Sequence, residues 1–212
     1  MTVPARPAPR RRNAEETQQR LMEAGENLFS AKGFAATTLD AIAETAGVNK
    51  AMIRYYFKDK DGLYTAIVEH IIDDVLDQFE KALEGDGEPV DTMGDFIEVF
   101  ANAIIARPAF PRMLLRDYLD GDIMTREGPA EKLRNFLETT RKFYEAGHAA
   151  GRFREVDVHM LHLSIVGAAI FFSLTDRIRT QITRHQGMAD LEIKSASFAQ
   201  HLRRLVLGGI ET

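Results

Sequence analysis

The side chains best suited to binding a partner lie in residues 49–60, which combine an arginine, two tyrosines and several lysines. At helical spacing, one face carries Ala51, Met52, Arg54 and Tyr55. An arginine that forks onto guanine, a tyrosine that reaches phosphate and a small alanine suit a helix in the DNA major groove. Lysines flank this helix at the height of the phosphates: Lys50, Lys58 and Lys60. The segment therefore has the chemistry of a DNA-reading helix.

The residues before this helix predict a shorter helix that ends at a glycine. Either Thr37 or Thr38 can cap its first turn, and Asp40 stands three residues after Thr37 as in a weak capping box. Gly47 ends the helix where a left-handed backbone conformation costs little. Its apolar stripe consists of Leu39, Ile42, Ala43 and Ala46. The pair of helices is typical of a helix-turn-helix, although a surface hairpin of an ordinary bundle has the same pattern.

The charge of the chain is distributed unevenly, which favours the first of these readings. Residues 1–60 contain ten Lys and Arg against seven Asp and Glu, a net charge of +3. Because the whole chain has a net charge of −5, residues 61–212 carry −8. A basic head on an acidic body is what a DNA-binding protein with a second domain would show. Residues 1–13 are rich in proline and predict a disordered basic arm, either a solubilising tail or a minor-groove contact. The arginines of this arm are Arg10, Arg11 and Arg12.

The sequence closely resembles the TetR family of transcriptional regulators between about Glu15 and Leu63. The tract 55–63, YYFKDKDGL, resembles the end of that family's DNA-binding domain, and AGENLF and KGF resemble its first helix and loop. The family's recognition helix commonly reads SKGTLYYHF, which Lys50, Tyr55 and Phe57 match. The departures fall on the base-facing side, at Ala51, Met52 and Arg54, so the resemblance implies DNA binding without implying an operator sequence. The DNA contacts that follow from the motif and the arm are Arg10, Arg11, Arg12, Thr37, Thr38, Asn49, Lys50, Ala51, Met52, Arg54, Tyr55, Tyr56 and Lys60.

The remainder of the chain predicts helices throughout. A long helix capped by Asp59 runs to Leu83, and four breaks follow, at 85–89, Pro108, Gly121 and Gly151. The helices expected between them cover about 92–106, 110–119, 129–150, 156 to beyond 176, and 188–207. No strand alternation or internal repeat is found, so we expect an all-α fold. The predicted organisation is a disordered arm at 1–13, a three-helix head at 14–60 and a helical-bundle effector and dimerisation domain at 61–212.

The sequence contains no strong catalytic or metal-binding signature. His159 and His162 stand near Asp157, but a spacing of i and i+3 without a third strong ligand is more often a packed or surface pair of histidines. The chain has no cysteine, which excludes thiolate metal sites and thiol catalysis. We therefore expect neither a cofactor nor a metal, and no enzyme activity.

The resemblance implies an apolar pocket in the body that opens to a small effector. Helical faces alone suggest a lining of Ile71, Phe100, Ile104, Met113, Phe136, Thr140, His162 and Val166, with Arg116 or Arg107 as a polar anchor. A packed core is the simpler reading of the same residues. The last two helices are expected to form a homodimer through Ile165, Ala168, Ala169, Phe172, Leu191, Phe198, Leu202 and Leu205.

The motif and the family resemblance together imply a homodimeric regulator, a repressor that binds a palindromic operator and is released by a small apolar or amphipathic effector. The alternative is a helical enzyme or carrier whose N-terminal helices are an interaction module. A cytoplasmic location is expected, because the longest apolar run, 165–174, is shorter than the roughly twenty residues that cross a bilayer. The basic N-terminus also lacks the apolar region of a secretory signal.

Overall fold

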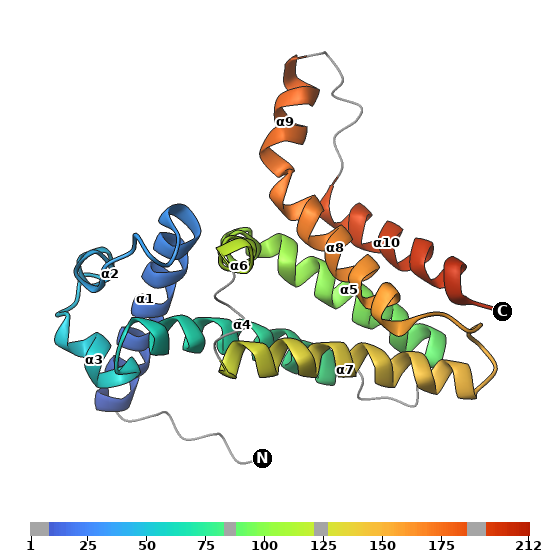
Figure 1. The fold of residues 1–212 in the computed structure, drawn as a ribbon, viewed down its shortest axis with the longest axis horizontal. Coiled ribbons are helices and arrows are strands. Elements are labelled where there is room, and N and C mark those ends of the chain that lie inside the picture. The colour runs from blue at the N-terminus through green and yellow to red at the C-terminus, as the bar shows by residue number, and fades with distance from the viewer. Residues whose placement is uncertain (1–8, 83–87, 121–126, 186–193) are drawn as a thin grey trace.

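The computed structural model describes residues 9–82, 88–120, 127–185 and 194–212 (Figure 1). The described residues form ten helices and one isolated bridge, between Phe153 and Glu211. This confirms the predicted all-α fold. The helices are α1 (Pro9–Lys32), α2 (Leu39–Ala46), α3 (Ala51–Phe57), α4 (Lys60–Ala82), α5 (Pro89–Ala106), α6 (Ala109–Asp120), α7 (Glu127–Ala149), α8 (Val158–Leu174), α9 (Asp176–His185) and α10 (Ser195–Ile210).

The first three helices form a head at one end of the molecule, with α2 and α3 beside α1 (Figure 1). Their shared core includes Leu21, Ile42 and Ile53, none of which is exposed to solvent. Phe29 lies edge-on to Tyr64 of α4, with ring centroids 5.4 Å apart. The apolar faces predicted for the head therefore meet as expected, and α4 takes part in the same core.

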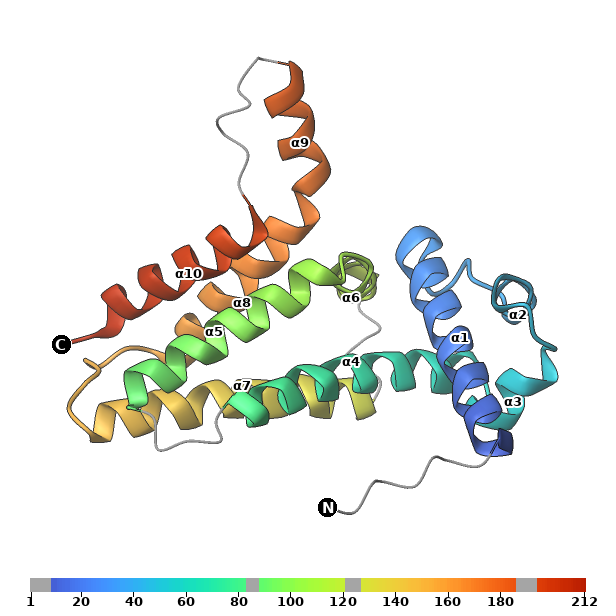
Figure 2. The ribbon, with the colours of Figure 1, turned by 180° about the vertical axis from the view of Figure 1, so that it is seen from behind.

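Helix α4 runs from the head into the body, where α7 lies along it (Figures 1 and 2). Asp59 caps its first turn as predicted, because its Oδ1 accepts a hydrogen bond of 2.8 Å from the Gly62 N–H. In the body, α5 packs against α8 and α10, and the Arg203 guanidinium on α10 bonds to Asp95 of α5 at 2.7 Å. One continuous helix thus belongs to both the head core and the body.

Two predicted boundaries were wrong. Helix α1 begins at Pro9 rather than near residue 15, so Arg10, Arg11 and Arg12 belong to a helix and not to an extended arm. Proline is tolerated in the first turn of a helix, where its missing N–H has no intrahelical partner. Residues 1–8 of the predicted arm lie outside the described residues.

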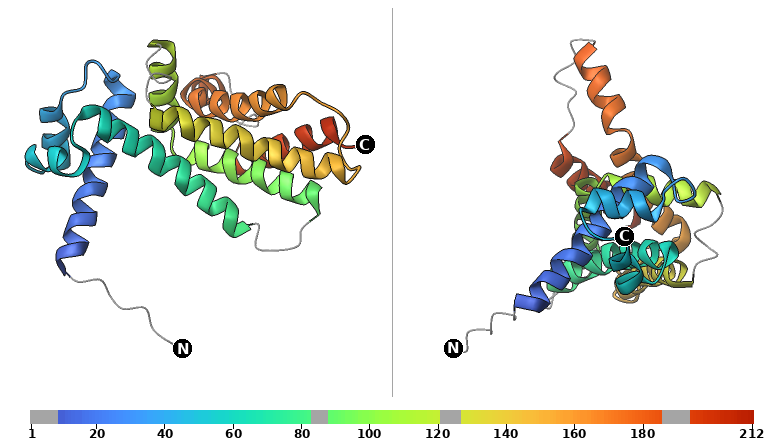
Figure 3. Two further views of the ribbon diagram at one scale, coloured as in Figure 1. Left: turned by 60° about the horizontal axis from the view of Figure 1, so that its bottom comes forward. Right: turned by 90° about the vertical axis from the view of Figure 1, so that its left-hand side faces the viewer.

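The second wrong boundary concerns the helix expected from 156 to beyond 176. The chain bends by 56° at Thr175 and continues as α9, which projects away from the body (Figure 3, right). The Arg179 side chain of α9 donates hydrogen bonds to the Phe172 carbonyl and to Thr175 Oγ1, which stabilises the bend. Among the described residues no single helix is both long enough and apolar enough to cross a membrane. Only α8 and α9 taken together, with the bend between them, have that length and composition.

Candidate nucleic-acid interface and body cleft

Helix α3 presents the polar face that its sequence predicts. Ala51, Arg54 and Tyr55 are exposed, Tyr55 by 77%, whereas Ile53 and Phe57 are buried beneath them. The Tyr55 ring packs edge-on against Tyr56, which is half-buried together with Met52. No hydrogen bond or ion pair joins the Arg54 side chain to another described residue. The outer face of α3 therefore offers an arginine and a tyrosine to an external partner.

The turn before α3 is fixed by contacts from both sides. Thr38 caps α2 by accepting the Ala41 N–H at 3.2 Å, and Gly47 ends α2 with a φ of 63°. From α1, the Arg20 guanidinium donates to the carbonyls of Ala46 and Gly47. Sequence reasoning missed Arg20, because a basic residue on an amphipathic helix gives no sign of the carbonyls that it will meet.

The ends of α3 carry the remaining polar groups of the predicted interface. Asn49 Oδ1 accepts the Ala51 N–H at 2.8 Å and so fixes the turn directly before α3. The Lys50 ammonium pairs with Asp40 at 2.8 Å, but both side chains are exposed enough for solvent to weaken the pair. Lys58 is exposed, adopts a positive φ of 72°, and has no side-chain bond to another described residue. Lys50 and Lys58 can therefore reach phosphates at the two ends of α3.

Two of the predicted DNA contacts, Thr37 and Lys60, instead bind backbone carbonyls within the head. Thr37 is 1% exposed, and its hydroxyl donates to the Gly33 carbonyl at 2.7 Å. The Lys60 ammonium donates to the carbonyls of Phe34 at 2.8 Å and Thr37 at 3.0 Å, and it lies 4.3 Å from the Phe34 ring centroid. Both residues hold the loop between α1 and α2. We correct their assignment accordingly, since charge and residue type alone do not reveal that a backbone carbonyl is the partner.

In the body, four residues of the predicted pocket lining come together. The rings of Phe100 and Phe136 lie 4.8 Å apart, and Phe136 is edge-on to His162 at 5.4 Å. His162 Nδ1 and the fully buried Thr140 hydroxyl are 2.8 Å apart. Burial lowers the pKa of His162, and the nearby His159 lowers it further, so the ring is neutral at pH 7. Helices α5, α7 and α8 thus enclose one neutral polar pair among aromatic rings.

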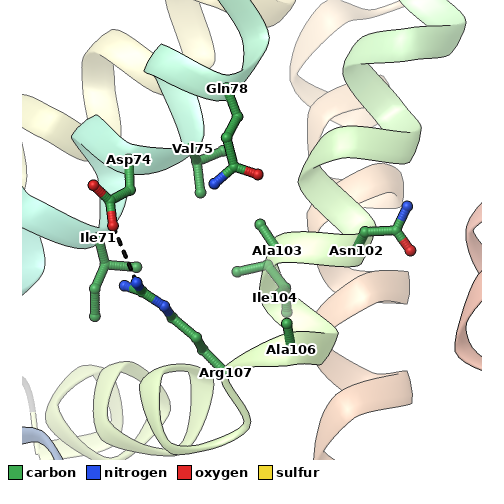
Figure 4. A pocket seen from close by; sticks show the side chains of 9 residues that line it. All are labelled: Ile71, Asp74, Val75, Gln78, Asn102, Ala103, Ile104, Ala106 and Arg107. Atoms are coloured by element: carbon green, nitrogen blue, oxygen red, sulfur yellow. Dashed lines mark hydrogen bonds and ion pairs between the residues drawn. The ribbon is translucent and has the colours of Figure 1, made fainter. Parts of the chain in front are cut away.

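A cleft between α4 and α5 contains two further residues of the predicted lining, Ile71 and Ile104 (Figure 4). Its volume is about 250 Å³, and its mouth carries the ion pair between Arg107 and Asp74 at 3.0 Å. Arg107 is one of the two arginines that the sequence suggested as an anchor. The other lining residues are Val75, Gln78, Asn102, Ala103 and Ala106. The cleft is apolar inside and polar at its edge.

The second predicted anchor, Arg116, does not lie in this cleft. It is exposed on α6 and donates to the Ala31 carbonyl of α1 at 2.9 Å, so it joins the body to the head. Of the other predicted lining residues, Met113 is buried in the core and Val166 is half-buried on α8. The sequence placed Arg116 on the inner face of α6 from helical spacing, but α6 packs against α1, and Arg116 reaches the end of that helix.

The predicted dimer residues also need correction. Ile165, Ala169, Phe172 and Leu202 are buried inside the subunit and hold α8 and α10 in place. Ala168 and Phe198 are half-buried, Leu205 is 63% exposed, and Leu191 lies outside the described residues. The apolar residues that α8 exposes are instead Met160, Leu163 and Phe171. Helical periodicity identified an apolar helix correctly but not which of its sides faces outward, because α8 is apolar all round.

Polar side chains also meet where the head joins the body. A second, smaller cleft lies between α1 and α4 and is lined by Glu26, His70 and Arg107 among others. Burial raises the pKa of the Glu26 carboxyl, an effect that Arg107 and His70 partly offset. Arg107 therefore borders both clefts. Among the described residues, no group of three or more His, Asp or Glu side chains is arranged to hold a metal ion.

Two family descriptions match the chain and together span most of it. Residues 21–67 match the bacterial regulatory proteins of the tetR family, and residues 89–207 match a tetracyclin repressor-like C-terminal domain. The chain is 26% identical over 207 residues to the HTH-type transcriptional repressor NicS of Pseudomonas putida, covering 95% of each protein.

Solved structures share the fold over nearly the whole chain. The fatty acid degradation regulator FadR of Bacillus halodurans superposes with a TM-score of 0.72 at 15% identity, covering 97% of this chain and 98% of that one. FadR of Bacillus subtilis in complex with stearoyl-CoA gives a TM-score of 0.71 at 16% identity, covering 91% and 99%. At these identities the likeness concerns the fold.

Proposed function

The chain belongs to the TetR family of bacterial transcriptional regulators, and we propose that it is a homodimeric repressor that a small effector releases from a palindromic operator. The observation that carries this proposal is the outer face of α3, with Arg54 and Tyr55 exposed above a buried apolar side. A DNA-binding regulator of this family needs no catalytic group. The repressor assignment is supported by the name of the NicS relative.

Arg54 is the residue that we expect to read a base. Its guanidinium can donate two parallel hydrogen bonds to the O6 and N7 atoms of guanine in the major groove. Tyr55, Lys50 and Lys58 lie around it and are suited to phosphate contacts, which fix position without reading sequence. Specificity therefore depends on Arg54 and on the small residue Ala51, which allows close approach to the base edges.

Dimerisation is proposed to use the exposed side of α8 and α10. Met160, Leu163 and Phe171 are each more than 60% exposed on α8, and Leu205 is 63% exposed on α10. Exposed apolar residues gathered on one face mark an interaction site. A two-fold axis through this face would bring two copies of each helix together and hold two heads for the half-sites of a palindrome.

The effector is proposed to bind in the body, at the cleft of Figure 4 or among the aromatic rings beside it. The cleft has an apolar interior and the Arg107 and Asp74 pair at its edge, which suits a small apolar or amphipathic molecule. The stearoyl-CoA complex of Bacillus subtilis FadR supports the expectation that this fold accommodates an apolar effector.

The response to the effector is proposed to pass through α4, because this helix lines the cleft and also packs into the head core. An effector shifts DNA binding only by its differential affinity for two arrangements of the subunit, typically about 1–3 kcal/mol. Operator DNA must then weaken effector binding by the same factor. Filling the cleft with Ala103→Phe should preserve operator affinity and abolish release.

Binding selection from random DNA duplexes tests the proposal without knowledge of the operator. We expect the wild-type protein to enrich a palindrome, and Arg54→Ala to enrich a consensus degenerate at one position of each half-site. A library that shows no enriched sequence with the wild-type protein would contradict the proposed function. Enrichment of a single half-site would contradict the dimer alone.

A further inference from the structure

Helix α9 exposes an apolar face that no other part of the described chain covers. It projects from the end of α8 (Figures 1 and 2), and Ile178 and Ile182 on it are 57% and 48% exposed. Because they are four residues apart, both isoleucines lie on the same side of the helix. A helix of only ten residues gains little stability in water from its own hydrogen bonds. This exposed apolar face is therefore suited to packing against a partner.

The structure holds α9 in its projecting position. The Arg179 guanidinium lies 3.6 Å from the centroid of the Phe172 ring. Phe172 in turn stacks on Phe198 of α10, with ring centroids 3.9 Å apart and planes inclined by 13°. Arg179 also donates to Thr175 Oγ1 at 2.6 Å. These contacts fix α9 to the end of α8, which the Phe172–Phe198 stack fixes to α10, so Ile178 and Ile182 are kept from folding back onto their own subunit.

An open apolar groove lies at the other end of α8. It has a volume of about 400 Å³ and runs between the N-terminal half of α8 and the C-terminal half of α10. Its apolar lining includes Met160, Leu161, Ala168, Leu202, Leu205 and Val206. The groove and the apolar face of α9 thus lie at opposite ends of the same helix.

Two-fold symmetry brings such opposite ends together. When two copies of α8 pair antiparallel, the C-terminal end of one helix lies beside the N-terminal half of the other. Met160, Leu163, Gly167 and Phe171 form an exposed strip along α8 that connects the two features. We propose that α9 of each subunit lies in the α8–α10 groove of a second copy of this chain, with Ile178 and Ile182 as its anchors. This contact of α9 with the partner's groove, called the clasp below, rests on the homodimer of the proposed function.

The dimer dissociation constant tests the clasp. In sedimentation experiments, Ile178→Ala combined with Ile182→Ala should raise it at least about 100-fold, because four isoleucine contacts are lost per dimer. Both residues are exposed in the subunit, so its fold should be kept, which helicity by circular dichroism checks. Arg177→Ala, on the far side of α9, is the matched control and should change the constant less than about twofold, the scale of exposed charges. A double variant that dimerises like wild type would overturn the clasp but leave the dimer intact, whereas a monomeric wild type would overturn both.

Cross-linking tests the same contact in a chain that has no cysteine of its own. Ile182→Cys protein is mixed with Met160→Cys or Leu205→Cys protein and oxidised gently. A mixed disulfide dimer that forms faster than either variant forms a dimer alone is the expected result. Arg177→Cys in place of Ile182→Cys should give much less mixed product. Equal yields from positions 177 and 182 would contradict the placement of α9 in the groove.

Discussion

The head and the body use their basic side chains differently. On α3, the exposed Arg54 side chain has no hydrogen bond or ion pair with another described residue, and the same is true of the Lys58 side chain just after the helix. In the body, Arg203 of α10 is only 24% exposed and contacts Asp91, Asp95 and Glu98 on α5. Cations left without internal partners suit an external polyanion, whereas cations that meet carboxylates join helices. Net charge alone does not distinguish the two uses.

The joint between the two regions should be the most sensitive point. A Cβ atom on Gly62, at the start of α4, would lie 1.9 Å from the Phe57 carbonyl oxygen at the end of α3. Because that oxygen belongs to the backbone, Gly62→Ala should tilt α3 against α4 and lower the free energy of unfolding by about 1–3 kcal/mol. Specific DNA binding should fall more than tenfold. Thermal unfolding and operator titration measure the two effects, and unchanged values for both would show that the joint is not rigid.

Arg203 offers a test confined to the body. Arg203→Ala leaves three carboxylates near one another, and the partial exposure of the cluster limits the expected loss of stability to about 1–2 kcal/mol at pH 7. The salt dependence of DNA binding should not change. A changed salt slope would mean that Arg203 also faces DNA.

Two lysines at the ends of the same turn separate an external from an internal role. Lys58→Ala should reduce the slope of log affinity against log salt by about one unit, since one phosphate contact is lost. Lys60→Ala should leave the slope unchanged and lower the stability of the head by about 1 kcal/mol, because the carbonyls of Phe34 and Thr37 lose their donor. The opposite assignment would appear as a reduced slope for Lys60→Ala only.

The smallest effect concerns pH. His162 has a lowered pKa, so its contribution to stability is full above the ordinary histidine pKa of about 6.5 and is lost as the pH falls below that value. Glu26 has a raised pKa, so its contribution grows as the pH falls below the raised value. In thermal unfolding between pH 7 and 4, His162→Gln should remove the first trend and Glu26→Gln the second. Identical profiles for both variants and the wild type would contradict these shifts.

The head was predictable from sequence because its signals are local. Thr38, Gly47 and Asp59 act through neighbours a few residues away, and the structure confirms the cap, the left-handed turn and the start of α4. Thr37 and Lys60 were misassigned because their partners are carbonyls that only the folded loop brings near.

The body was predictable only in outline. The helices expected from periodicity are present, but the bend at Thr175 is accompanied by Arg179 lying over the Phe172 ring, which itself stacks on Phe198 of α10. The cleft likewise depends on Arg107 meeting Asp74, which stands 33 positions earlier in the chain. Contacts of this kind leave no periodic signal, so four of the proposed dimer residues were placed on the wrong side of their helices.

The most direct test of the central claim is the binding of wild-type and Arg54→Ala protein to the selected palindrome and to a random duplex at one salt concentration. We predict that the wild-type protein prefers the palindrome at least about 1,000-fold, as specific DNA-binding proteins do. Arg54→Ala should lose about 1–3 kcal/mol on the palindrome and almost nothing on the random duplex. Equal affinity of the wild-type protein for both duplexes would contradict the account, and equal weakening of the variant on both would reduce Arg54 to a phosphate contact.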